Sequence, residues 1–140
     1  MAFRVDITET ALGDAEEYVR FIREQGSEPE VAERWWRGLL DAIDSLEDMP
    51  ERCPPIPEIN EFEEKLRHLL YYSHRIVFRI NETGKTVVVL RIYHAARKTL
   101  SREDFMDRGR IYSLIIFGDP IPFRALRASK MSRLRSIIAA

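Results

Sequence analysis

The sequence predicts an α+β fold in which an N-terminal strand and a two-helix hairpin pack on an antiparallel sheet, in the order β-α-α-β-β-β. Three observations support this prediction. An alternating apolar pattern opens the chain, two segments with helical spacing follow it, and β-branched and aromatic residues dominate residues 65–93. The chain has 140 residues, 45% of them hydrophobic, which is enough for one core.

The first strand and the first helix adjoin each other. Phe3 to Ile7 alternate apolar and polar residues, the period of a half-buried strand. Thr8 then offers a hydroxyl that can cap a helix, and Gly26 is placed to end that helix. Apolar residues recur between them at helical spacing, at Leu12, Ala15, Val19 and Ile22.

The second helix follows at once. Residues 27–30 read Ser-Glu-Pro-Glu, the form of a capping box with Ser27 as the cap and proline in the first turn. The apolar positions that continue at spacings of three and four are Val31, Trp35, Leu39, Ala42 and Leu46. The two segments therefore predict a helical hairpin with a tight turn.

A proline-rich linker leads from the hairpin to the sheet. Residues 49–59 hold four prolines, a density that excludes regular helix or central strand. Three strands are predicted after it, at Lys65–Tyr72, His74–Ile80 and Lys85–Tyr93, with a hairpin turn at residues 81–84. Ser101 is a plausible cap for a further short helical stretch.

The sequence suggests a division into a main domain, residues 1–106, and a basic C-terminal extension, residues 107–140. The extension holds seven basic and two acidic residues, although the whole chain carries a net charge of −1. It contains an apolar run at 111–117 and a basic amphipathic stretch at 124–138. Two interpretations stay open: an extra strand and helix packed on the sheet edge or hairpin, or a poorly ordered segment.

Composition argues against several classes of protein. No apolar run is long enough to span a bilayer, and the N-terminal residues lack the pattern of a secretory signal, so we expect a cytoplasmic protein that does not engage a membrane. The single cysteine, Cys53, cannot form an intrachain disulfide and has no cysteine neighbours for a metal cluster. We expect neither a metal nor a cofactor.

Candidate chemistry lies on the predicted sheet. Metal-free RNA cleavage needs a general base, a general acid and fixed positive charge on the phosphate. His94 or Tyr93 could transfer protons, and Arg75 or Arg67 could hold the phosphate. Further cations for a phosphate or a partner are Arg79, Arg91, Arg97 and Lys98. Arginines on a sheet face also pair with surface carboxylates, and a histidine at a strand end is often structural, so this site is a hypothesis.

Trp35 and Trp36 are adjacent in the second helix and therefore point about 100° apart. One can enter the core while the other lies near the surface. An exposed Trp36 would suit a partner interface, because aromatic residues are enriched at interface hot spots. Burial of Trp36 within the hairpin is the alternative.

Residues 3–105 resemble the RelE/ParE superfamily of toxins from type II toxin–antitoxin systems, also described as plasmid stabilisation proteins. The resemblance rests on His-Arg-Ile-Val-Phe-Arg-Ile at 74–80 and on Val-Val-Leu-Arg-Ile-Tyr-His-Ala-Ala-Arg at 88–97, in that order after a helical hairpin. It implies a growth-inhibiting toxin that a cognate antitoxin neutralises, with operator DNA bound only through the antitoxin. The tail beyond Asp107 departs from the family pattern.

The resemblance implies one of two mechanisms. ParE-like members inhibit DNA gyrase, and the ending Arg-x-Tyr-His-Ala-Ala-Arg at 91–97 and the thin supply of lysines favour that branch. RelE-like members are mRNA interferases, metal-independent endoribonucleases that act at the ribosome, and Arg75 and His94 match positions used by some of them. Whether the chain is an enzyme is therefore open. A third possibility is a scaffold that binds antitoxin but is not toxic.

Overall fold

The computed structural model describes residues 2–57, 65–94, 106–107, 110–111 and 121–125. The chain begins with strand β1 (Arg4–Ile7), helices α1 (Glu9–Glu24) and α2 (Pro29–Asp44) and two 3-10 turns, η1 (Ser45–Glu47) and η2 (Pro50–Arg52). Strands β2 (Arg67–Tyr71), β3 (His74–Asn81) and β4 (Thr86–His94) follow, and then the short strands β5 (Met106–Asp107), β6 (Arg110–Ile111) and β7 (Ile121–Pro122). The predicted α+β order is confirmed.

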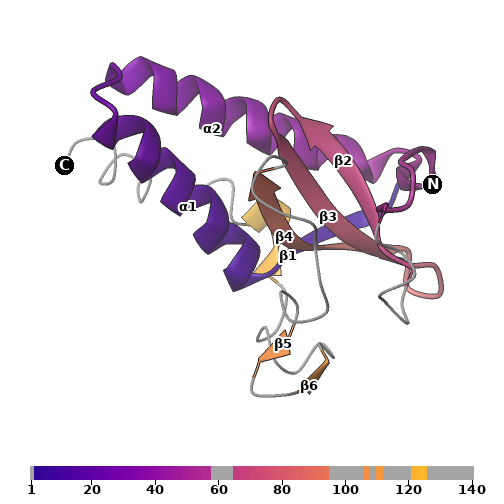
Figure 1. Ribbon diagram of the computed structural model, residues 1–140. Coiled ribbons are helices and arrows are strands. Elements are labelled where there is room, and N and C mark those ends of the chain that lie inside the picture. The colour runs from indigo at the N-terminus through magenta and orange to yellow at the C-terminus, as the bar shows by residue number, and fades with distance from the viewer. Residues whose placement is uncertain (1, 58–64, 95–105, 108–109, 112–120, 126–140) are drawn as a thin grey trace.

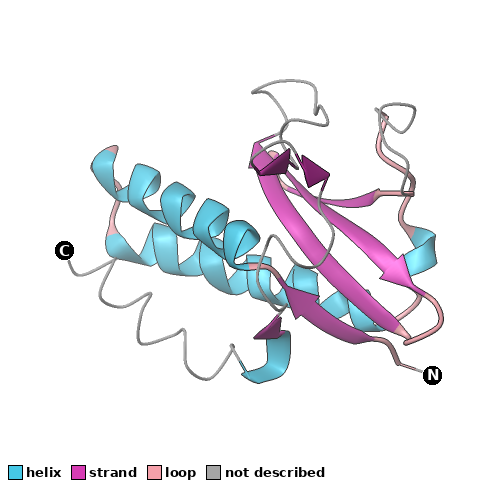
Figure 2. Ribbon diagram, turned by 90° about the horizontal axis from the view of Figure 1, so that it is seen from below, coloured by secondary structure: helices cyan, strands magenta, loops and turns pink. Residues whose placement is uncertain are grey.

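The main sheet has the strand order β2-β3-β4-β1-β7. Strands β2, β3 and β4 are antiparallel neighbours, as predicted. Strand β1 joins β4 in parallel and β7 in the antiparallel sense, so the complete sheet is mixed. Figure 1 shows the helical hairpin on one side of this sheet, and Figure 2 shows the same two-layer arrangement from below.

The core lies between the hairpin and one face of the sheet. Its largest fully buried side chains include Trp36, Leu39 and Ile43 from α2 and Ile76 and Phe78 from β3. A smaller apolar cluster occupies the opposite, outer face of the sheet. It consists of Ile56, Leu66, Val77, Val88 and Leu90, with Tyr93 packed against them.

Strand β4 contains an irregularity that decides which face its last residues occupy. Val77 of β3 pairs with Arg91, but the next residue, Phe78, pairs with Val89, so Leu90 is an extra residue on β4. Before the bulge Val87 and Val89 face the hairpin, and after it Ile92 does. Without the bulge, alternation would point Arg91 toward the hairpin core. With it, Arg91 faces outward and the apolar Ile92 takes the core position.

The capping box predicted for the second helix is wrong. The N-cap of α2 is Glu28, whose side chain makes no capping bond, and Pro29 occupies the first turn. The residue before a proline is forced out of helical conformation, and Glu28 has extended dihedral angles of φ −60° and ψ 147°. The helix can therefore begin only at Pro29. The Ser27 carbonyl instead accepts a hydrogen bond from Arg23 at 2.6 Å.

The other predicted boundaries hold to within a few residues. Thr8 is the N-cap of α1, and the Asn81 side chain accepts a hydrogen bond from the Gly84 amide in the β3–β4 turn. Up to residue 57, where the described part of the linker ends, the chain after α2 forms the 3-10 turns and an isolated bridge from Pro55 to Arg67. The short helix predicted from Ser101 lies outside the described residues.

Part of the C-terminal extension joins the main fold. Strand β7 pairs with the free edge of β1, and Phe123 beyond it is 2% exposed within the main core. This agrees with the interpretation of an extra element on the sheet edge. The stretches 112–117 and 126–138 lie outside the described residues. The β5–β6 ladder includes residues on both sides of the predicted boundary between residues 106 and 107, and this division stays a prediction.

Helix α2 and strand β2 approach closely at Gly38. The Tyr71 hydroxyl donates a hydrogen bond to the Trp35 carbonyl at 2.8 Å, and a Cβ built on Gly38 would overlap that hydroxyl. Burial raises the pKa of Tyr71, so the hydroxyl keeps its proton and acts as a donor. Glycine is required at this position because of the contact and not because of its backbone angles.

Gly38→Ala should lower the free energy of unfolding by about 1–3 kcal/mol, because the added methyl must displace Tyr71. Gly13→Ala is the matched control, since nothing lies within 4 Å of a Cβ there and alanine is the better helix former. Urea unfolding measures both. A Gly38→Ala variant as stable as Gly13→Ala would contradict the close contact.

Phe123→Ala should cost about 3–5 kcal/mol, the usual range for removing a buried phenylalanine side chain. Its neighbour Arg124 pairs with Glu47 but has a side chain that is 83% exposed, so Arg124→Ala should cost less than about 1 kcal/mol. Thermal unfolding of both variants tests whether this segment belongs to the core. Equal, small losses would show that it does not.

Candidate functional site

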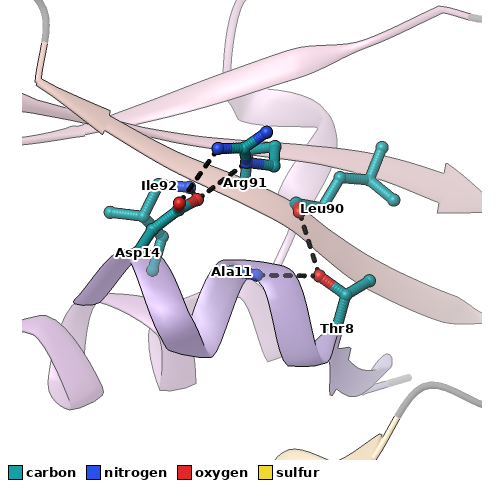
Figure 3. Close-up of polar contacts among 6 residues, drawn as sticks. All are labelled: Thr8, Ala11, Asp14, Leu90, Arg91 and Ile92. Carbon is teal, nitrogen blue, oxygen red and sulfur yellow. Dashed lines mark hydrogen bonds and ion pairs between the residues drawn. The ribbon is translucent and has the colours of Figure 1, made fainter. Parts of the chain in front are cut away.

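The junction between β1 and α1 sets the position of the candidate site. The Thr8 amide donates to the Val89 carbonyl at 3.0 Å, continuing the strand ladder by one bond. The Thr8 hydroxyl accepts from the Ala11 amide at 3.1 Å and donates to the Leu90 carbonyl at 2.9 Å, as Figure 3 shows. One side chain thus caps the helix and holds its first turn on β4.

Beyond this junction β1 no longer pairs with β4, and Asp14 of α1 takes its place. The Asp14 carboxylate accepts hydrogen bonds from Arg91 Nε at 2.8 Å, from Arg91 NH2 at 3.0 Å and from the Ile92 amide at 3.0 Å. These contacts are drawn in Figure 3. The carboxylate therefore satisfies a strand donor and a guanidinium together, which fixes the helix along the strand.

Burial raises the pKa of Asp14, and the hydrogen bond and charge of Arg91 and the Ile92 amide lower it without cancelling the effect of burial. The side chains of Asp14 and Arg91 are 15% and 19% exposed. The cost of taking a carboxylate out of water is thus large here. The pair serves to position α1 more than to add net stability.

An aromatic–imidazole cluster, made of Tyr18, Trp35, His74 and His94, lies next to this ion pair. The ring centre of His74 is 4.2 Å from that of Tyr18, 5.2 Å from Trp35 and 5.0 Å from His94. His74 and His94 are cross-strand partners, so the two imidazoles share the hairpin face of the sheet. The cluster joins both helices to the ends of β3 and β4.

Two hollows flank the cluster. The first, the α1–β4 cleft, has a volume of about 310 Å³ and is lined by Asp14, Glu17, Tyr18, Arg20, Phe21, Glu24 and the ends of β3 and β4. The second, of about 300 Å³, lies between α2 and the β2–β3 turn and is lined partly by Val31, Trp35 and Tyr72. Tyr72 is 86% exposed and has a left-handed backbone with φ 48°.

The structure brings only part of the proposed catalytic set together, because Tyr93 and His94 both line the α1–β4 cleft with Arg91, whereas Arg75 and Arg67 are not part of its lining. Arg75 pairs with Tyr93 on the outer face, whereas His94 lies on the hairpin face. Arg67 pairs with Phe78, a core residue of the hairpin face, and donates to the carbonyls of Cys53 and Glu51. Arg75 and Arg67, the arginines proposed to hold the phosphate, therefore do not line the cleft that Tyr93 and His94 share.

The other predicted cations are also distributed. Arg79 shares the outer face with Arg75, and Arg91 stacks on Tyr93 at 4.6 Å while its guanidinium binds Asp14. Arg97 and Lys98 lie outside the described residues. Among the residues that are described, no three potential ligands form a metal site. No helix in the described ranges is both long and apolar enough to cross a membrane.

The prediction of an exposed Trp36 is wrong. Trp36 is 1% exposed and belongs to the main core, because it points between α2 and the sheet. Trp35 is the tryptophan near the surface, half-buried in the aromatic–imidazole cluster. Trp36 therefore cannot anchor a partner on this surface.

Comparison with known proteins identifies the family. Residues 5–99 match the family model described as the ParE toxin of the type II toxin–antitoxin system parDE. The chain belongs to the ParE toxin family. A comparison with curated proteins finds no match. A similar solved chain comes from the crystal structure of the toxin–antitoxin complex RelBE2 of Mycobacterium tuberculosis, with 22% identity, coverage of 67% of this chain and 99% of that chain, and a TM-score of 0.45.

The sequence alone did not predict a site at the α1–β4 cleft of this ParE family toxin. Asp14, Glu17 and Phe21 resemble ordinary surface residues of an amphipathic helix, and the partners of Asp14 are more than 70 residues away in β4. The sequence did contain one indication of a binding surface. Tyr18 and Phe21 are aromatic residues three positions apart on the helix, and Phe21 lies outside the row of apolar residues that faces the core. Aromatic residues at helical spacing are more often part of a core than of a binding site.

In the ParE family toxin, Asp14→Ala should lower the free energy of unfolding by about 2–4 kcal/mol, because Arg91 and the Ile92 amide lose their acceptor. The Asp14→Ala/Arg91→Ala double variant should lose less than the sum of the single variants. Arg37→Ala, which removes an exposed pair with Glu33 within α2, is the control and should cost less than about 0.5 kcal/mol. Additive losses at Asp14 and Arg91 would contradict the coupling.

Proposed function

We propose that this type II toxin inhibits DNA gyrase and that a cognate antitoxin neutralises it. Two findings support the proposal. The match to the ParE family model covers residues 5–99, and the arginines proposed to hold the phosphate, Arg75 and Arg67, do not line the cleft that Tyr93 and His94 share. The second finding carries most weight, because it bears on mechanism and is independent of family resemblance.

Cleavage of RNA without a metal requires a base, an acid and a phosphate-binding cation within hydrogen-bond reach of one phosphodiester. His94 makes an edge contact with His74 and lines the α1–β4 cleft with Tyr93, but Arg75 pairs with Tyr93 from the outer face and is not part of the cleft lining. Arg67 binds loop carbonyls, and Arg91 binds Asp14. The arrangement supports inhibition by binding better than it supports ribonuclease chemistry.

Binding functions have a suitable surface in this structure. The two hollows beside the aromatic–imidazole cluster lie on the helical hairpin side and carry exposed aromatic rings at Phe21 and Tyr72. Rings with large contact areas and few rotatable bonds are typical of protein interfaces. The proposal places both the target and the antitoxin among protein partners in the cytoplasm, with operator DNA reached only through the antitoxin.

The test adds the purified chain to DNA gyrase and follows supercoiling of a relaxed plasmid. Inhibition is expected in proportion to the amount of toxin, and relaxation by a type I topoisomerase should be unaffected in the parallel control. In a translation extract with a defined mRNA, primer extension should find no new 5′ ends. Unchanged gyrase activity together with codon-positioned cuts would overturn the proposal in favour of an mRNA interferase.

A third outcome of the same experiment concerns the non-toxic scaffold. If neither gyrase nor mRNA is affected and expression of the chain leaves growth unchanged, this outcome too would contradict inhibition of gyrase. Co-purification with the product of a neighbouring short reading frame would then identify an antitoxin-binding protein without toxicity.

A further inference from the structure

The α1–β4 cleft has walls of an unusual composition for an exposed surface. Tyr18 and Phe21 stack with ring centres 5.7 Å apart and 26° between their planes. Phe21 is 44% exposed, although a phenylalanine gains free energy from burial. Tyr18 in turn packs on His74, so its ring is held from behind by the aromatic–imidazole cluster. The cleft therefore presents fixed aromatic surface to whatever enters it.

The charges of the cleft favour a cation. Asp14 and Arg91 compensate each other through their bidentate pair. The lining also holds the exposed Glu17 and Glu24 and the cation Arg20, so it carries one net negative charge when His74 and His94 are neutral. Burial is the main reason that the pKa of Asp14 is raised, and the charge of Glu17 adds to it.

We propose that this cleft binds one arginine side chain of a protein partner. A guanidinium group can stack on the Tyr18–Phe21 rings and at the same time pair with a carboxylate through its planar fork. A lysine ammonium has no planar face, and an uncharged planar group can donate hydrogen bonds to Glu17 and Glu24 but forms no ion pair with them. The volume of about 310 Å³ lies at the small end of ligand sites and suits a single side chain.

The arginine site is independent of the proposed target. It requires only a protein partner with an exposed arginine, so it stands whether or not the chain inhibits gyrase. A failed supercoiling assay and a failed arginine titration would therefore refute different statements.

The experiment titrates the isotopically labelled full-length chain with a blocked Ala-Arg-Ala tripeptide and follows the backbone amide signals by NMR. Signals from residues 14–24 and 91–94 should shift in a saturable manner. The same peptide with citrulline, which keeps the planar group without the charge, should shift them little, and the lysine peptide should bind more weakly than the arginine peptide. Equal binding of the citrulline or lysine peptide would overturn the proposal, as would an absence of shifts at the cleft.

Variants identify the charges that matter. Glu17→Gln and Glu24→Gln should each weaken binding of the arginine peptide by about two- to five-fold, the usual effect of one exposed ion pair. Glu9→Gln removes a charge from the same helix outside the cleft lining and should leave the affinity unchanged. All three positions are exposed, so unchanged spectra in the absence of peptide will show that folding is intact. Equal affinity of all four proteins would rule out recognition by these carboxylates.

Discussion

The change of partner along strand β4 is the constraint on which the rest of this structure depends. Strand β1 pairs with β4 only as far as Ile7, and Thr8 then turns the chain into α1 while its hydroxyl binds the Leu90 carbonyl. A strand that lost its neighbour at this point would leave buried amides without acceptors. The Asp14 carboxylate supplies the acceptor for Ile92 from the helix, so the same contact closes the sheet edge and aligns the hairpin. The cleft and the aromatic–imidazole cluster exist because α1 is held in this position.

The elements of this fold could be predicted because each is encoded locally. Alternation at residues 3–7, helical spacing after Thr8 and the β-rich segments after Lys65 depend on near neighbours in the sequence. The parallel pairing of β1 with β4 and the extra residue at Leu90 depend on contacts between distant segments. The capping-box prediction failed for a local reason that was available in the sequence: Pro29 keeps its preceding residue out of the helix, and this outweighed the favourable form of Ser27 to Glu30.

The candidate site could be predicted only within single strands. Alternation along a single strand is enough to separate His74 from Arg75 and to put Arg91 on the same face as Tyr93, and the structure has them so. Alternation could not show that Arg67 faces the hairpin with Phe78, since that follows from the register between strands. The two tryptophans illustrate a similar limit. Their difference in direction follows from helical geometry, but only the packing of α2 on the sheet decides that Trp36 is the buried one.

The antiparallel pairing of β7 with β1 has a consequence for synthesis of the protein. Strand β1 lies between β4 and β7 in the sheet, so its two hydrogen-bonding edges are filled by segments that are synthesised much later. The edge toward β4 can close once residues 86–89 have emerged, whereas the other edge must wait for residues 121–122. Until then β1 presents an open strand edge of the kind that recruits other chains. A nascent chain halted before residue 121 would thus be more prone to aggregation than the released protein.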